Sequence, residues 1–351
     1  PPRVVEPPHP PAAEPPTTRT SPPPVPEKPT TRPTADEPAS DTVDTQNDES
    51  PGWLVPGLTG SGAVLAAGVL LAIRAHRRTQ LRYRRPGQRI APPPSELLTV
   101  EKTAFVSGGS HVDLLGRLDR ALRYLAEQLQ LEGRSLAPVV SATLVRNTVT
   151  LRLVEGVDLP LPWAGEDCEW SMALDESLPD VDQIAPYPLL VSIGQSDTGG
   201  LLLLNLEHLG TTTLTGDAVA ALALARHLAA ELALNPWSAS VYVETIGIGD
   251  ELAELGGLRL RQHTPDTGIV EEVLAGLRHA EQAGHGEPEP FYAVITTETD
   301  QATQMTEILR RATSRLGAAA LYLNETPIPD SVSAELSEDG RLRILALGID
   351  V

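Results

Sequence analysis

The stretch that decides the fold is PLLVSIGQSDTGGLLLLNLEHLGTTTLTGDAVAALALARHLAAELALNPWSASVYVETIGIG, residues 188–249. Its runs PLLVSIG, GLLLLNLE and GTTTLTG are apolar or β-branched and predict three strands. The run DAVAALALARHLAAELAL (217–234) predicts a helix that begins at Asp217 and ends before Asn235-Pro236. The following run, SVYVETIGIG, predicts a buried strand.

The same alternation continues to the end of the chain. Helices are predicted over 269–283 and 300–314, and strands over FYAVITTE and AAALYLNE. A hairpin with its turn at Asp339-Gly340 closes the sequence. Alternating strands and helices predict crossover units on a mainly parallel sheet that is covered on both faces. We therefore assign residues 188–351 to one α/β domain.

A smaller α+β subdomain is predicted to precede it, over residues 111–187. Ser110 is placed to cap a helix whose leucines recur at three- and four-residue steps. Two β-rich runs follow, 138–145 and 147–154, with Arg146-Asn147 at the turn between them. Trp163 and Trp170 are interpreted as packing anchors.

Residues 53–73 form a stretch of twenty-one positions without a charged side chain. A helix of about twenty apolar residues is long enough to cross a bilayer. Small side chains recur along the stretch at nearly four-residue spacing, so close packing of two such helices into a homo-oligomer is one possibility. The sequence thus predicts a single transmembrane helix.

Seven arginines and no acidic residue follow the predicted span. Such a basic segment predicts the cytoplasmic side of a membrane and contact with anionic lipid headgroups. These membrane-surface residues are Arg74, Arg77, Arg78, Arg82, Arg84, Arg85 and Arg89.

The remaining segments complete the predicted organisation. Residues 1–52 hold sixteen of the thirty-three prolines and are expected to be a disordered, extracytoplasmic stalk. Residues 74–110 are interpreted as a basic juxtamembrane segment and connector. The expected protein is therefore a single-pass protein of the bacterial cell membrane with its C-terminal domain in the cytoplasm.

Charge and cysteine content exclude several functions. The net charge of −20 combines −5 over 1–52 and +7 over 74–89, which leaves −22 from Ile90 onward. Such an acidic part is a poor direct partner for nucleic acid, whose binding rests on Lys and Arg. The single cysteine, Cys168, excludes an intrachain disulfide, and its acidic neighbours disfavour a reactive thiolate.

A phosphate-binding loop is the first chemistry to seek in such a domain. Gly210 and Gly216 flank a strand-to-helix junction at the right place. Asp217 and Ala218 stand where the motif needs Lys and Ser or Thr, and no lysine occurs after Lys102. These residues predict a degenerate phosphate-loop position that binds no cofactor.

Other patterns for chemistry are equally incomplete. Gly247 and Gly249 lack the third glycine of a dinucleotide fingerprint. His279 and His285 are six residues apart, which argues against a paired metal site. Glu244, with Asp250 and Glu251, is interpreted as part of a solvated rim. We therefore predict no catalytic residue, metal or cofactor.

The stretch LLVSIGQSDTGG through NPWSASVYVETIG resembles the core of FtsK/SpoIIIE-type ATPases over about sixty residues. The resemblance implies a nucleotide-dependent motor fold that moves DNA or exported proteins. Because the loop lysine and a Walker B acid are missing, it implies an inactive copy. Arg226, the one candidate to replace the lysine, lies about two turns into the helix and is badly placed.

A second resemblance covers nearly the whole chain. The Pro/Thr stalk, the RAHRRTQLRYRRPGQRI run and the GLLLLNLEHLG and ELALNPWS segments resemble large actinobacterial membrane proteins. Those proteins join a LysM module to a bacterial transcriptional activator domain, and neither module occurs here. Because the chain starts with Pro1, we expect it to be the middle part of a longer protein.

The sequence predicts a non-enzymatic, membrane-anchored scaffold or signal relay between the cell envelope and a cytoplasmic, possibly transcriptional, regulator. One alternative is an inactive ATPase-like component of a secretion or DNA-translocation assembly. A second alternative is a membrane-tethered NTPase. The protein partner is not identified by the residues.

Overall fold

The computed structural model describes part of the chain: residues 68–69, 95–174, 177–196, 199–248, 252, 259–265, 267–283, 288, 290–312 and 314–351. Over 95–111 only the backbone is described. These residues all belong to one compact unit, Glu49–Val351. The predicted stalk, 1–52, lies outside the described residues.

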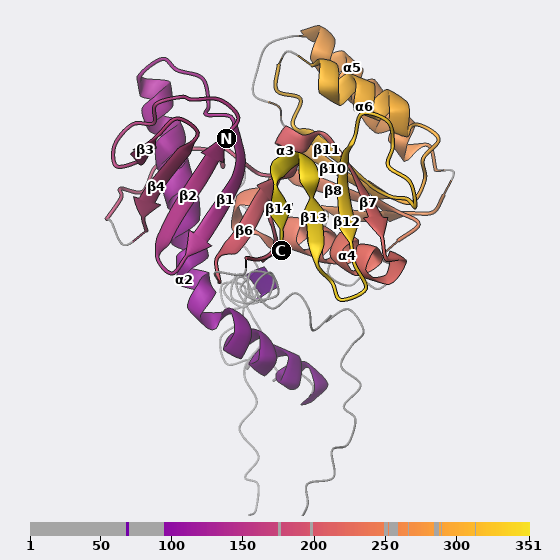
Figure 1. The fold of residues 1–351 in the computed structure, drawn as a ribbon, viewed down its shortest axis with the longest axis horizontal. Helices are drawn as coiled ribbons and strands as arrows, with labels where there is room; N and C mark the ends of the chain where they lie inside the picture. Colours follow the sequence, from indigo (N-terminus) through magenta and orange to yellow (C-terminus); the bar gives the residue numbers. More distant parts are fainter. Residues whose placement is uncertain are drawn as a thin grey trace, which may run out of the picture. The chain divides into compact units, whose positions relative to one another are not determined.

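The first sheet is antiparallel and contains six strands in the spatial order β3-β4-β2-β1-β6-β5 (Figure 1). Its strands are β1 (Val139–Val145), β2 (Thr148–Leu153), β3 (Ala164–Glu166), β4 (Glu169–Ala173), β5 (Leu190–Gln195) and β6 (Leu201–Asn205). The long helix α2 (Ser95–Leu131) packs its leucines against one face. Trp163 and Trp170 are buried in the same cluster, which confirms them as packing anchors.

The second sheet contains eight strands in the order β14-β13-β12-β7-β11-β10-β8-β9. The six strands from β12 to β9 are parallel, and β13 and β14 pair antiparallel at one edge. The strands are β7 (Thr211–Gly216), β8 (Val241–Ile246), β9 (Leu260–His263), β10 (Phe291–Thr296), β11 (Ala318–Leu323), β12 (Val332–Leu336), β13 (Leu342–Ile344) and β14 (Ile349–Asp350).

Helices cover both faces of the second sheet. Helix α4 (Ala218–Leu234) packs on one face, while α5 (Ile269–Ala283) and α6 (Ala302–Arg311) lie next to each other on the other (Figure 1). The shorter helices are α3 (Leu206–Leu209), η1 (Pro236–Ser238) and η3 (Leu345–Leu347). The predicted helices over 217–234 and 269–283 and the hairpin at Asp339-Gly340 are confirmed.

The prediction of one mainly parallel sheet over 188–351 is wrong. Strands β5 and β6 pair with each other antiparallel, and β6 pairs with β1, so both lie in the first sheet. The second sheet is mixed, because β13 and β14 reverse direction. The physical reason is the short β5–β6 connection, which favours a hairpin, whereas a parallel pair needs a crossover of a dozen or more residues. The antiparallel sheet thereby joins residues on both sides of position 187.

The predicted transmembrane helix over 53–73 is also corrected. Among the described residues, no helix combines the length and the apolar character that crossing a membrane requires. Helix α4 is apolar but has 17 residues, and α2 has 37 residues but carries charged side chains. Within 53–73 only Gly68 and Val69 are described, and Val69 packs against the protein core around α4. The single-pass membrane localisation that rested on this helix is therefore not kept.

Helix α4 is buried between the two sheets. Its sequence is almost entirely Ala and Leu, which are strong helix formers and are apolar on every side. One core cluster contains α4 residues together with Val191 and Leu204 of the first sheet and Val243 and Ile295 of the second. Successive residues of β6, Leu203 and Leu204, point to opposite faces, so β6 contacts both the α2 side and the α4 side.

A fully buried carboxylate interrupts this apolar helix. Glu231 accepts hydrogen bonds from the Ser192 backbone N–H (2.8 Å), the Ser192 hydroxyl (2.5 Å) and the Asn235 side-chain amide (3.0 Å). His227, one turn earlier, places Nε2 3.0 Å from the same carboxylate. These contacts tie α4 to strand β5, because a buried carboxylate is tolerated only when it is paired and hydrogen-bonded.

Glu231→Ala is expected to lower the free energy of unfolding by about 3–5 kcal/mol, because several buried donors lose their acceptor. Glu231→Gln retains one acceptor oxygen at nearly the same volume and should lose less. Urea unfolding of the full chain measures both. Glu281→Ala, at an exposed position of α5, is the control and should stay within about 0.5 kcal/mol. A loss below about 1 kcal/mol for Glu231→Ala would contradict this account.

Candidate functional site

The junction between β7 and α4 is the degenerate phosphate-loop position of the sequence. Gly210 and Gly216 stand at opposite ends of strand β7 rather than around one loop. Asp217 alone connects the strand to the helix, and its carboxylate accepts a hydrogen bond from the Ala220 backbone N–H (2.8 Å). The helix N-terminus, where a phosphate would bind, is therefore capped by the protein's own carboxylate.

Strand β12 closes the same junction from the side. Gly216 has a φ of +90°, and a Cβ at this position would overlap the carbonyl oxygen of Leu336. The Asp217 N–H donates to that same oxygen (2.8 Å). Glycine is required here both by the backbone conformation and by the close approach of β12. The junction has the strand–helix order of a nucleotide site but no loop that can surround a phosphate.

The other predicted positions are not brought together into a site. Gly247 has a φ of +69°, as expected of a tight turn, while Gly249 lies outside the described residues, as do Asp250, Glu251 and His285. His279 is exposed on α5. Among the described residues no group of His, Cys, Asp and Glu is placed to hold a metal ion. The seven membrane-surface arginines, 74–89, also lie outside the described part, so their contact with lipid stays a prediction.

Glu244 is not part of a solvated rim. Its side chain is fully buried on β8, where it pairs with Arg261 and with His263 Nε2 (2.7 Å), both on β9. Arg261 also lies over the ring of Tyr242, with its guanidinium carbon 4.9 Å from the ring centroid. The prediction failed because β9 was not recognised in the sequence. Once β9 pairs with β8, the register places both basic side chains beside Glu244.

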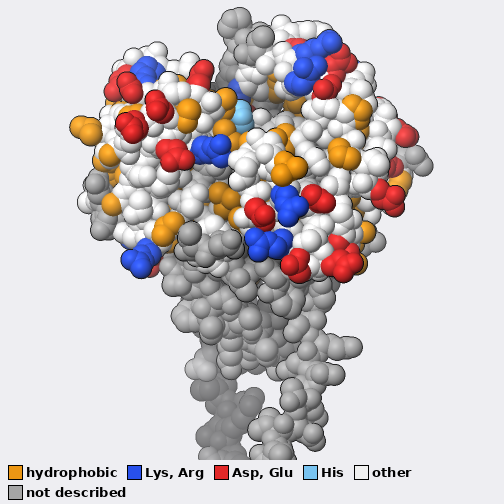
Figure 2. Space-filling model, in the orientation of Figure 1, with side chains coloured by type: hydrophobic (Ala, Val, Ile, Leu, Met, Phe, Trp, Pro, Cys, Tyr) orange, Lys and Arg blue, Asp and Glu red, His pale blue; other side chains and the backbone are white. Residues whose placement is uncertain are grey.

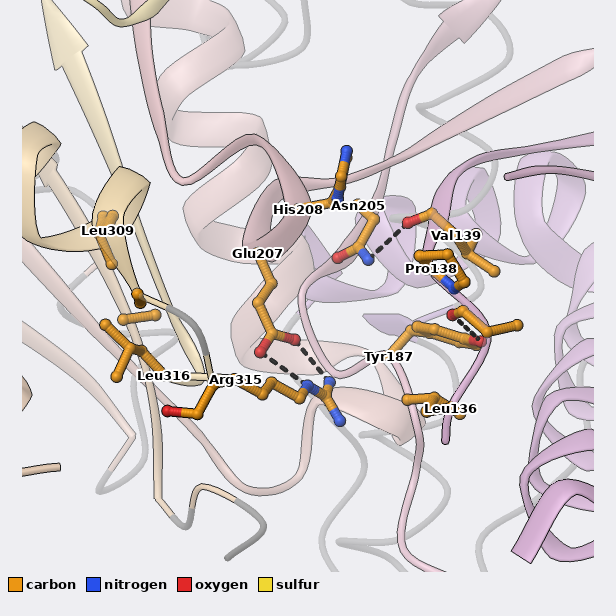
Figure 3. A pocket seen from close by; sticks show the side chains of 14 residues that line it. Leu136, Pro138, Val139, Tyr187, Asn205, Glu207, His208, Leu309, Arg315 and Leu316 are labelled. Atoms are coloured by element: carbon orange, nitrogen blue, oxygen red, sulfur yellow. Dashed lines mark hydrogen bonds and ion pairs between the residues drawn. The ribbon is translucent and has the colours of Figure 1, made fainter. Parts of the chain in front are cut away.

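A pocket of about 240 Å³ lies where the two sheets meet near α3 (Figure 3). Its walls come from the segment that enters β1, from α3, and from the end of α6 with the loop that follows it. Glu207 and Arg315 face each other across it and form two hydrogen bonds, of 2.7 and 2.5 Å. The apolar part of the lining includes Leu136, Leu309 and Leu316.

Most polar groups of this pocket already have partners. The Tyr187 hydroxyl donates to the Ala137 carbonyl (2.8 Å), and burial raises the pKa of this phenol, so it stays protonated. Arg315 also donates to the Pro186 carbonyl (2.7 Å). The Asn205 amide donates to the Val139 carbonyl (2.9 Å), while its own side-chain oxygen is buried without a partner among the described residues. The polar groups of the pocket therefore mainly hydrogen-bond to one another and connect the segments that meet between the two sheets.

His208 is the remaining titratable group of the pocket. Partial desolvation lowers the pKa of its imidazole, and the nearby Glu207 carboxylate opposes this shift. The ring is therefore neutral at pH 7. Among the described residues that line the pocket, no nucleophile lies beside a base, and the one close charged pair is Glu207 with Arg315. The arrangement can hold two sheets together or bind a neutral group, but it lacks the pairing of nucleophile and base that covalent catalysis needs.

Comparison with known proteins gives distant likenesses only. No family model matches the chain, and no curated protein matches it. One similar solved structure is Thermomonospora curvata EccC (ATPases 2 and 3) in complex with a signal sequence peptide. The identity is 11%, the TM-score is 0.36, and the match covers 50% of this chain and 43% of that one.

A second solved structure is the cytoplasmic domain of the Thermomonospora curvata type VII secretion ATPase EccC. The identity is 16%, the TM-score is 0.30, and the match covers 42% of this chain and 24% of that one. This chain therefore matches less than half the length of either EccC chain. Both are ATPases, the class to which the resemblance of residues 189–247 points, whereas no family model supports the LysM and activator-domain resemblance. At these similarities neither structure carries an argument about activity.

Because the junction is closed, a side chain at position 216 should strongly destabilise the folded protein. Gly216→Ala should lower the free energy of unfolding by about 2–5 kcal/mol, because strain at positive φ adds to overlap with β12. The control is Gly276→Ala in α5, where a Cβ meets no atom within 4 Å. That variant should be more stable by about 0.5–1 kcal/mol. Equal stability of Gly216→Ala and the parent chain in urea unfolding would refute the close approach.

Proposed function

We propose that residues 95–351 form a non-hydrolysing, ATPase-like domain that contributes binding surfaces to a larger protein assembly. The closed β7–α4 junction is the observation that carries this proposal. Asp217 occupies the helix N-terminus and β12 covers Gly216. A nucleotide triphosphate would meet a carboxylate where it needs a lysine and backbone N–H groups. The proposal rests on this geometry and not on the distant likeness to EccC.

The surface favours protein partners over nucleic acid. Figure 2 shows acidic and basic side chains interspersed on the viewed face, where the described residues form no broad basic region. Around β12–β14, Arg341 pairs with Asp350 (3.1 Å) and Arg343 lies 3.9 Å from Glu335. Nucleic-acid affinity needs clustered Lys and Arg that neutralise phosphates. A surface of mixed charge suits contacts with folded proteins.

Nucleotide binding is the first test. Titration of the full chain with Mg-ATP, followed by thermal unfolding and by equilibrium dialysis of labelled ATP, should show no saturable binding and no hydrolysis. Asp217→Ala is the informative variant, because it removes the carboxylate and leaves β12 in place. It too should bind no ATP. Saturable binding to the parent chain, with a rise in unfolding temperature, would overturn the proposal.

The proposed role in an assembly is tested by capturing the protein partner. The full chain, immobilised and exposed to an extract of the organism that encodes it, should retain a protein that carries a complete phosphate loop and hydrolyses ATP. The two should then co-elute at a fixed stoichiometry in size-exclusion chromatography. Retention of a transcriptional regulator without ATPase activity would instead favour a signal relay and contradict the assembly role.

A further inference from the structure

Helix α4 has an apolar side that points away from its core leucines. Leu224, Leu228 and Leu232 belong to the core cluster that includes strands of both sheets. At about 100° of rotation per residue, the opposite side of the helix carries a stripe of apolar residues with a single charged member. This outer stripe consists of Val219, Leu222, Ala223, Arg226, Ala230 and Ala233.

The outer stripe is open at one end and covered at the other. Val219, in the first turn of α4, is 76% exposed, whereas Ala230, three turns later, is 2% exposed. Ala233 and Leu234, in the last turn, are half-buried and pack against the core cluster. A contiguous apolar surface on a folded protein commonly marks a place where another segment or molecule binds.

Gly68 and Val69 lie against the covered end. A Cβ built on Gly68 would lie 3.4 Å from the Leu234 Cβ and 3.7 Å from the Asn235 side-chain oxygen. Val69 packs against the same core cluster as α4. These distances are within the range of van der Waals contact. The absence of a side chain at position 68 thus lets this part of the chain approach the end of α4 closely.

The sequence before Gly68 matches the rest of the stripe in character and in length. Gly68 and Val69 belong to the stretch 53–73, which has no charged side chain. An apolar stretch and an apolar stripe are both stabilised when their contact removes them from water. Fifteen residues, 53–67, precede Gly68 in the stretch, and fifteen positions separate Val219 from Leu234. Even at the helical rise of about 1.5 Å per residue, residues 53–67 are long enough to reach Val219.

We propose that the outer stripe of α4 is the docking surface for the chain's own charge-free stretch, residues 53–73. Gly68 and Val69 are the part seated beside Leu234, and residues 53–67 continue along α4 toward Val219. The stretch covers a side of α4 that the core leucines do not use and withholds it from other proteins. This inference goes beyond the ATPase-like function proposed above and does not depend on it.

A disulfide in the full chain tests the seated end. Cys168→Ser provides the background, because Cys168 is the single cysteine. Gly68→Cys and Leu234→Cys together place two Cβ atoms close to the spacing of about 3.8 Å that a disulfide requires. Oxidised glutathione should join this pair within one chain, as measured by intact mass and by mobility on a non-reducing gel. The pair Gly68→Cys and Val219→Cys, about 22 Å apart along α4, is the control and should form a disulfide at least about tenfold more slowly.

Photo-crosslinking tests the open end. With p-benzoylphenylalanine in place of Val219, irradiation of the full chain should give crosslinks that map to residues 53–67 of the same chain. The same group in place of Ala280, an exposed residue of α5 on the other face of the second sheet, is the control and should give none to that stretch. Val69→Glu should lower the crosslink yield from position 219 at least about tenfold, because a charge opposes burial of the stretch. Ala275→Glu, at an exposed position of α5, should leave the yield unchanged.

Three results would overturn the proposal. The first is a Gly68→Cys and Leu234→Cys pair that does not close, or that closes only between two chains, which would make a second copy the occupant. The second is a crosslink pattern from position 219 that omits residues 53–67. The third is loss of these crosslinks when vesicles of phosphatidylglycerol and phosphatidylethanolamine are added, which would show that a membrane takes the stretch instead. Each of these results leaves the nucleotide and capture experiments as they were.

Discussion

Helix α4 is buried against β5 and β6 on one side and against the parallel strands on the other, and the rest of the structure depends on this double contact. Burying a leucine side chain contributes about 1.5–3 kcal/mol, and Leu224, Leu228 and Leu232 are all at most 2% exposed. A helix that is apolar on nearly every side is stabilised by burial, and here both sheets provide apolar surface for it. The hydrogen bonds of Glu231 to Ser192 then fix the helix against β5 in one orientation.

The nucleotide position at the start of α4 is closed by its own neighbours in the fold. Strand β7 leads into α4 through Asp217 alone, so no residues remain to form a loop around a phosphate. Strand β12 pairs with β7 as far as Gly216 and fills the side of the junction. The junction has the order of strand, turn and helix that phosphate-binding sites use, but its helix N-terminus is occupied by the Asp217 cap. A role in assembly, without hydrolysis, is consistent with that cap.

Much of this architecture could be predicted from local sequence. Helix α4 has its cap at Asp217 and its end at Asn235-Pro236, and α5 has the bounds that its apolar spacing indicates. The sequence did not predict which strands pair when they lie far apart along the chain. Nothing local to 190–205 shows that β6 pairs with β1, sixty residues earlier. The short strand β9 was missed, and with it the partners of Glu244. The contact of Gly68 with the end of α4 joins segments that are far apart in the sequence, so only the fold reveals it.

Helix α4 contacts both sheets, and we expect it to join them into one cooperative unit. Native-state hydrogen exchange in rising urea tests it most directly, because it measures the opening free energy of each backbone amide. The amides of β1 in the first sheet, of β10 in the second and of α4 should converge on one opening free energy. Separate opening of the first sheet, at a lower free energy and with α4 still protected, would contradict it.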